Sequence, residues 1–301
     1  MELSINIGNL LSRYDLETSI DLAKQAGFTA MDYSLMDMVK DDAPFNGDNY
    51  LELAHAVRAL ADAKGFPVNQ THAPFSFGSK LWGDPEYYQS VILPRMIRSI
   101  EISGILGAKV IVIHPLHHIT YHGNEETLFR MNMDYYRSLI PYAAKAGVKI
   151  GVENMFQSDP LRKYIVADTC STAEEFVRYI DELNSEHITA CLDIGHVALP
   201  LTDATAADVI RALGHHRLGA LHVHDNDYTR DLHILPYLGK LNWAEICAAL
   251  GEIDYQGDFT YEVNGQLFLN CDEEFVPLGV GFMGTVGKHL CSMVEANRKT
   301  L

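Results

Sequence analysis

The alternation of short β-rich runs with amphipathic stretches is the feature of this sequence that most limits its fold. The β-rich runs span residues 3–8, 30–35, 68–73, 110–115, 149–154, 189–195, 219–225 and 259–264. Apolar residues recur at helical spacing in the stretches 15–26, 50–64, 87–106, 127–146, 172–183, 204–213, 243–250 and 278–297. Several of these stretches end in a glycine, such as Gly27 and Gly147, as helices commonly do.

Eight strand–helix repeats without a long linker predict a (β/α)8 TIM barrel, with parallel strands inside and helices outside. We expect a single domain of this kind over residues 1–301. The alternative is a doubly wound sheet, which normally carries a glycine-rich first turn. The first turn here reads Gly8-Asn9-Leu10 rather than GxGxxG, and this favours the barrel.

Side chains able to bind a metal stand at the ends of six consecutive predicted strands. They are His72, His114, Glu153, Asp193, His222 and Glu262, and His196, Asp231 and His233 follow in the loops after the sixth and seventh strands. Active sites of such barrels lie at the C-terminal ends of the strands. A single histidine of this set is more easily explained as a satisfied core or loop residue. Six strand ends in succession predict a metal site.

The residue types at these positions point to a particular chemistry. Carboxylates with imidazoles suit Mn²⁺, Zn²⁺ or a similar divalent ion, and no cysteine stands at a strand end. Glu153, Asp193, His222 and Glu262 would converge on one ion, which polarises a carbonyl and stabilises the enediolate formed when a neighbouring C–H loses its proton. The two glutamates come from strands three apart, so they can flank a substrate and transfer protons on either side of it.

Charge and cysteine content restrict the class of protein. With 23 basic and 40 acidic residues the formal net charge is −17, and no run of Lys and Arg suggests a groove for nucleic acid or an anionic membrane. The five cysteines form no CxxC pair, and we expect them to be reduced. The first fifteen residues become polar too soon for a signal peptide, and no apolar run approaches ~20 residues. We therefore expect a cytoplasmic protein that does not enter the membrane.

Four short segments resemble the xylose isomerase-like TIM-barrel superfamily of sugar isomerases and epimerases, which also contains the endonuclease IV-like AP endonucleases. The segments are VEN (152–154), LDIGH (192–196), HVHDN (222–226) and RDLH…LGKLNW (230–243). The resemblance implies that Glu153, Asp193, His222 and Glu262 bind the metal, that both glutamates transfer protons and that His196 contacts a substrate oxygen. Many relatives have glycine where this chain has Tyr237, so the loop after the seventh strand is expected to close differently.

We expect a metal-dependent isomerase or epimerase that acts on an unphosphorylated ketose or keto-polyol, with Mn²⁺ as its ion and Zn²⁺ as the alternative. Arg230, Trp82 and Asn154 are predicted to bind substrate, although Arg230 is as readily explained by an ion pair with Asp231 or a neighbour. His72, His114, Asp231 and His233 are predicted to bind further metal or substrate.

Two other activities remain open. Aromatic loop residues such as Trp82 would suit a lyase that cleaves oxidised (3-keto) glycosides, as catalytic subunits of C-glycoside deglycosylases do. The extra histidines would also suit an abasic-site nuclease with three zinc ions, but the acidic loops argue against it. The sequence also leaves open whether a second copy of the chain or a separate subunit covers the barrel mouth.

Overall fold

The computed structural model describes residues 1–75, 77–159, 161, 163–199 and 204–298. Its eight parallel strands are hydrogen-bonded in the order β10-β1-β2-β3-β4-β5-β8-β9. They are β1 (Leu3–Asn6), β2 (Ala30–Ser34), β3 (Val68–His72), β4 (Val110–Ile113), β5 (Lys149–Glu153), β8 (Ile188–Asp193), β9 (Leu218–His222) and β10 (Phe259–Tyr261). The N–H of Val223 donates to the carbonyl of Thr260 at 2.9 Å, which joins the last two strands and closes the barrel. The predicted (β/α)8 fold is confirmed.

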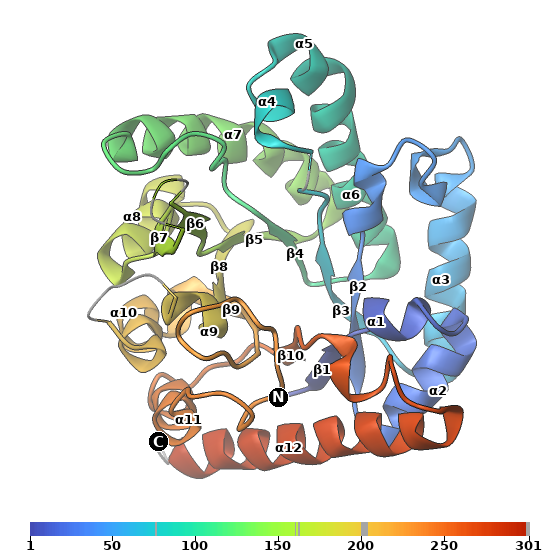
Figure 1. Cartoon of the computed structure of the whole chain (residues 1–301). Helices are drawn as coiled ribbons and strands as arrows, with labels where there is room; N and C mark the ends of the chain where they lie inside the picture. Colours follow the sequence, from blue (N-terminus) through green and yellow to red (C-terminus); the bar gives the residue numbers. More distant parts are fainter. Residues whose placement is uncertain (76, 160, 162, 200–203, 299–301) are drawn as a thin grey trace.

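Eight long helices surround the strands (Figure 1). They are α2 (Leu16–Ala26), α3 (Tyr50–Lys64), α6 (Leu93–Leu106), α7 (Glu125–Ala146), α8 (Ala173–Leu183), α10 (Ala206–Arg217), α11 (Trp243–Glu252) and α12 (Val276–Asn297). Local sequence sets their ends. Thr205 caps α10 through a reciprocal pair of hydrogen bonds with Asp208, and Gly27 ends α2 in the left-handed conformation with φ 93°. None of the described helices is long and apolar enough to span a membrane.

The core has two parts. A large apolar layer lies between the strands and the helices and contains Tyr136, Tyr179 and Trp243, each almost fully buried. Burying a large apolar side chain stabilises a fold by about 1.5–3 kcal/mol. Inside the barrel, Val110, Val112, Cys191 and Ala220 form a smaller cluster. These apolar side chains fill part of the barrel interior, so the polar side chains gather at the C-terminal ends of the strands.

The helix predicted over residues 87–106 is interrupted. A short turn, α5 (Pro85–Tyr87), leads into a π-helical segment at Tyr88–Ile92, and α6 begins only at Leu93. Pro94 lies in the first turn of α6 and has no N–H to donate to the preceding turn, which disfavours regular α-helical hydrogen bonding at this point. Two short strands, β6 (Phe156–Ser158) and β7 (Ile165–Ala167), form a hairpin after β5 that the sequence pattern did not predict.

Candidate functional site

The four predicted metal ligands meet at the C-terminal rim of the barrel. Glu153, Asp193 and His222 are the last residues of β5, β8 and β9, and Glu262 follows β10 directly. The Nδ1 atom of His222 lies 2.9 Å from Glu153 Oε1, 3.2 Å from Glu262 Oε2 and 4.0 Å from Asp193 Oδ2. One atom from each of the four residues can be chosen so that all lie within 4.8 Å of one another. Neighbouring strands that end at the same level produce this convergence.

Two more histidines, from β3 and from the residue after β4, lie close to the buried Glu153. His72, the last residue of β3, places Nε2 3.5 Å from Glu153 Oε2, and His114, just after β4, places Nε2 3.0 Å from the same oxygen. These three side chains form a second group with the spacing of metal ligands. Glu153 therefore lies at the junction of two groups.

A third group comes from the loops after β8 and β9. It contains His196, His224, Asp231 and His233. The Nε2 atom of His233 lies 3.0 Å from Asp231 Oδ2, and His196 Nε2 lies 3.7 Å from the same oxygen. His224 Nε2 lies 2.9 Å from Asp193 Oδ1, so Asp193 connects this group to the central one.

His224 has no role in the sequence-based prediction, although it stands in the same loop. Two signals could have identified it. His222 and His224 are two residues apart, so an extended chain places both on the same face. Gly195 also stands against its ring: a Cβ at position 195 would overlap the imidazole of His224. The small residue within LDIGH makes room for the histidine.

The donor set of the central group fits a divalent ion. Ligand atoms about 2.0–2.2 Å from an ion are at most about 4.4 Å apart, close to the present spacing. Three carboxylates and one imidazole suit Mn²⁺ or Zn²⁺. Among the described residues, His222 Nε2 in the central group and Asp231 Oδ1 in the third group are buried without a hydrogen bond. Unpaired buried polar atoms are costly in most folds and are common where an ion or substrate completes the site.

Charges within the site shift the pKa values of its histidines. Burial alone lowers the pKa of His222, but the carboxylates of Glu262 and Glu153 outweigh it and raise that pKa well above its ordinary value. Burial likewise opposes the effect of Asp193 and Asp231 on His196, whose pKa rises to about 10. The pKa of His233 rises to about 9 despite burial, mainly through Asp231. Without an ion, protons on these rings balance the carboxylates.

Metal binding is therefore expected to release protons. A histidine binds a metal only in its neutral form, and His222 has a raised pKa, so an ion must displace its proton. We expect the solution to acidify when MnCl₂ or ZnCl₂ is added in weak buffer at pH 7, and the metal Kd to fall as pH rises from 6 to 8. Calorimetry in buffers of different ionisation enthalpy measures the number of protons. Binding without proton release would contradict this charge assignment.

Asn154 holds two residues of the site in position. Its amide donates to the carbonyl of Asp193 at 3.0 Å and accepts from the N–H of Asp193 at 2.8 Å, and its own backbone carbonyl lies 2.9 Å from Nδ1 of His196. The residue is buried. These contacts position two site residues, whereas the predicted contact between Asn154 and substrate stays a prediction.

Asp225 organises the loop that carries Asp231 and His233. Its carboxylate accepts from the N–H groups of Tyr237 and Leu241 at 3.0 and 3.1 Å and from the indole of Trp243 at 2.8 Å. Tyr237 adopts φ 75°, a left-handed conformation that glycine would adopt more easily. The loop after β9 therefore adopts this left-handed backbone conformation at Tyr237 without a glycine.

Arg230 and Trp82 are the other two residues predicted to contact substrate. The guanidinium of Arg230 pairs with Asp227 at 2.7 Å, and its side chain is 71% exposed. The indole of Trp82 donates to the carbonyl of Phe75 at 3.2 Å, and its ring packs near Phe77. In this conformation both side chains are engaged within their own loops.

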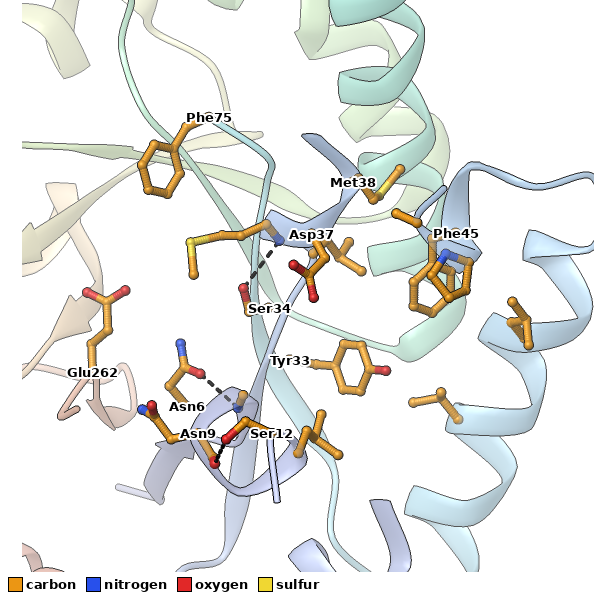
Figure 2. Close-up of a pocket in the computed structure, with 18 of the residues that line it drawn as sticks. Asn6, Asn9, Ser12, Tyr33, Ser34, Asp37, Met38, Phe45, Phe75 and Glu262 are labelled. Carbon is orange, nitrogen blue, oxygen red and sulfur yellow. Dashed lines mark hydrogen bonds between the residues drawn. The ribbon is translucent and has the colours of Figure 1, made fainter. Parts of the chain in front are cut away.

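An open cleft leads outward from the central group. Glu262 and His233 line its inner end, and Phe75, stacked at 4.1 Å between ring centroids on His114, stands beside them. The cleft continues over the ends of β1 and β2 towards α3. Figure 2 shows Glu262 and Phe75 on one side and Tyr33 and Phe45 on the other.

Comparisons with known proteins agree with this architecture. A family model described as xylose isomerase-like TIM barrel matches residues 20–274. A D-psicose 3-epimerase of Enterocloster bolteae is 35% identical over 121 residues, which cover 40% of this chain and 35% of the epimerase. The crystal structure of a D-tagatose 3-epimerase-like protein superposes with a TM-score of 0.73 at 20% identity, covering 98% of this chain and 99% of the other. That of the IOLI protein with a bound zinc atom gives 0.72 at 17% identity and covers both chains completely.

The family match spans most of the chain, and the barrel, its closure and the polar strand ends are those expected from the four sequence segments described above. The chain therefore belongs to the xylose isomerase-like TIM-barrel family.

Proposed function

We propose that the protein is a divalent-metal-dependent isomerase or epimerase of an unphosphorylated ketose or keto-polyol. The observation that carries this proposal is the convergence of Glu153 and Glu262 on one imidazole from strands three positions apart in the barrel. The epimerase relatives support the same class of substrate. Among the described residues that line the cleft, none is Lys or Arg, which favours a substrate without phosphate.

In this proposal Glu153, Asp193, His222 and Glu262 hold the ion, with Mn²⁺ expected and Zn²⁺ as the alternative. The ion supplies Lewis-acid polarisation of a substrate carbonyl. Glu262, which lines the cleft, would take a proton from the carbon beside that carbonyl. Glu153 would enter the step protonated and give its proton to the same carbon or its neighbour, so that Glu262 ends protonated and Glu153 ends as the carboxylate. His196 is oriented by the Asn154 carbonyl and contacts a substrate oxygen.

The carboxylates of the central group are largely buried. Glu153 and Asp193 are buried, and the side chain of Glu262 is 16% exposed. In such a site charges interact more strongly than in water, and a proton removed from carbon is less readily lost to solvent. His72, His114, Asp231 and His233 are available for further ions or for substrate hydroxyls.

A screen of substrates tests the proposal. The purified protein with Mn²⁺ added back is incubated with free ketoses and with 3-keto-glycosides, and the products are identified by NMR. We expect a new epimer or isomer from at least one of them. A protein that binds metal but converts no substrate of either class would contradict the proposed reaction.

Cleavage of 3-keto-glycosides is the second candidate function. It begins with the same abstraction of a proton beside a carbonyl, so the same glutamates would serve. The volume of the cleft, about 800 Å³, favours it, because a glycoside extends beyond the sugar that binds at the metal. Release of the free aglycone, rather than an epimeric glycoside, would distinguish the two reactions.

We expect no cleavage of DNA that contains an abasic site, although several overlapping groups of potential metal ligands lie among the described residues. Duplex binding draws its affinity from clustered Lys and Arg that displace counterions, and this chain has 23 basic and 40 acidic residues. An incision assay on an abasic oligonucleotide at low and moderate salt measures this. Metal-dependent incision by the natural protein that is lost in Glu262→Gln would overturn the sugar proposal.

A further inference from the structure

The cleft beside the candidate metal centre is too large for a free monosaccharide alone. Its volume is about 800 Å³. Pockets that enclose drug-sized molecules measure about 300–1,000 Å³, and a ketose is smaller than such molecules. A sugar held at Glu262 and His233 would therefore leave much of the cleft unfilled.

The cleft changes in character along its length. Asn6, Ser34 and Asn264 provide polar atoms near Glu262. Farther out, apart from Asp37, the lining is mainly apolar, with Leu11, Tyr33, Met38, Phe45, Leu53 and Val57. Figure 2 shows Asn6 and Ser34 between the carboxylate of Glu262 and the rings of Tyr33 and Phe45. A ligand that matches this lining is polar at the metal end and apolar at the other.

The apolar end of the cleft is formed by side chains from three separate elements of the fold. The rings of Tyr33 and Phe45 meet edge to face, with centroids 6.2 Å apart and planes at 87°. Tyr33 stands on β2, Phe45 on the 3-10 turn Pro44–Asn46, and Val57 on α3, so three separate elements present apolar groups to one space. Both rings are half-buried and keep part of their surface open. An apolar or aromatic group can pack on such rings.

The charge of the residues that line the cleft further restricts the class of ligand that it can bind. Asp37 is the charged residue at the outer part of the cleft, and neither Lys nor Arg occurs among the described lining residues. An anionic substituent would meet no compensating charge there. The cleft is also continuous with Glu262, so one molecule can reach both ends.

We propose that Tyr33, Phe45 and Val57 form a subsite for an uncharged aromatic group that is attached to the sugar bound at the metal. A substrate that uses the whole cleft is then a keto-sugar that carries an apolar substituent, such as an aryl glycoside. This inference rests on the proposed function for the sugar end of the site. The subsite itself is defined by the apolar lining.

Direct binding tests the subsite without turnover. The Mn²⁺-loaded protein is titrated calorimetrically with 4-nitrophenyl β-D-glucopyranoside and with methyl β-D-glucopyranoside, which differ only in the aglycone. We expect the aryl glycoside to bind at least about tenfold more tightly. Phe45→Ala should remove most of this difference. Phe282→Ala, at a 50% exposed aromatic residue of α12 outside the cleft, should retain it.

Equal Kd values for the two glycosides, an aryl preference that survives Phe45→Ala, or no binding of either at millimolar concentration would overturn the subsite. Kinetics on the corresponding 3-keto-glycosides separate the two proposals. Turnover of both substrates without aryl preference would leave the proposed function intact and exclude the subsite. Aryl binding that depends on Phe45, with no turnover of any keto-sugar, would establish the subsite and exclude the reaction.

Discussion

Replacing Glu262 with Gln is expected to reduce turnover at least about a thousandfold while the protein remains folded. The substitution removes a negative ligand beside His222 and the base that lines the cleft. Positioned acid–base groups contribute about 10²–10⁴-fold to rate, and loss of a metal ligand adds to this. Gln has nearly the shape of Glu, and the side chain is partly exposed, so the melting temperature in the absence of metal should change little. Turnover and thermal unfolding measure the two effects.

Asp254→Asn provides the matched control, since it also converts an acid to its amide. Asp254 belongs to none of the ligand groups found among the described residues; it lies in the turn before β10, where it has φ 54° and pairs with Arg298 at 3.0 Å. Asn adopts left-handed conformations readily, so the backbone is preserved. We expect turnover close to that of the natural protein. Equal losses in both variants would place the catalytic base elsewhere.

Removal of divalent metal is expected to abolish turnover and to lower the melting temperature. An ion bound at a hundred times its Kd stabilises the native state by about 2.7 kcal/mol, which corresponds to roughly 5 °C in a chain of this size. Elemental analysis before and after dialysis against a chelator, together with thermal unfolding, measures both effects. Adding Mn²⁺ or Zn²⁺ should restore both the turnover and the melting temperature.

Asp193→Asn is the informative variant for this second prediction. Asp193 contributes to the central group and also contacts His224, so its charge serves both groups. We expect the metal-dependent rise in melting temperature to fall by more than half in this variant. No metal in the purified protein, combined with no stabilisation by added Mn²⁺ or Zn²⁺, would contradict the assignment of these residues as ligands.

The strands could be predicted from the sequence because burial on both faces produces short apolar runs with little ambiguity. VIVI at residues 110–113 and TACLD at 189–193 are examples that coincide with β4 and β8. The helix over residues 87–106 was less predictable, since its apolar spacing continues across Pro94 while the backbone changes to a π-helical turn. The hairpin of β6 and β7 has only three residues in each strand, too few for a periodic pattern.

The central group could be predicted because each ligand stands at a strand end, and strand ends of a barrel meet. His224 stands among the metal-capable side chains of the stretch 218–233, but no role could be assigned to it because it lies past the end of β9, where the direction of a side chain depends on the loop. The apolar end of the cleft could not be predicted from the sequence either. Tyr33, Phe45 and Val57 resemble core residues in sequence, and only the path of the chain between β2 and α3 leaves them facing open space.

Uptake of solvent deuterium is the most direct test of the central claim that two glutamates move a proton on a carbon beside a carbonyl. A ketose or 3-keto-glycoside identified in the substrate screen is incubated with the Mn²⁺-loaded protein in D₂O, and the recovered substrate and product are analysed by NMR. We predict deuterium at the carbon beside the carbonyl, and at least a thousandfold slower incorporation with Glu262→Gln. Conversion without deuterium at that carbon, or incorporation at the natural rate in Glu262→Gln, would contradict the proposed proton transfer.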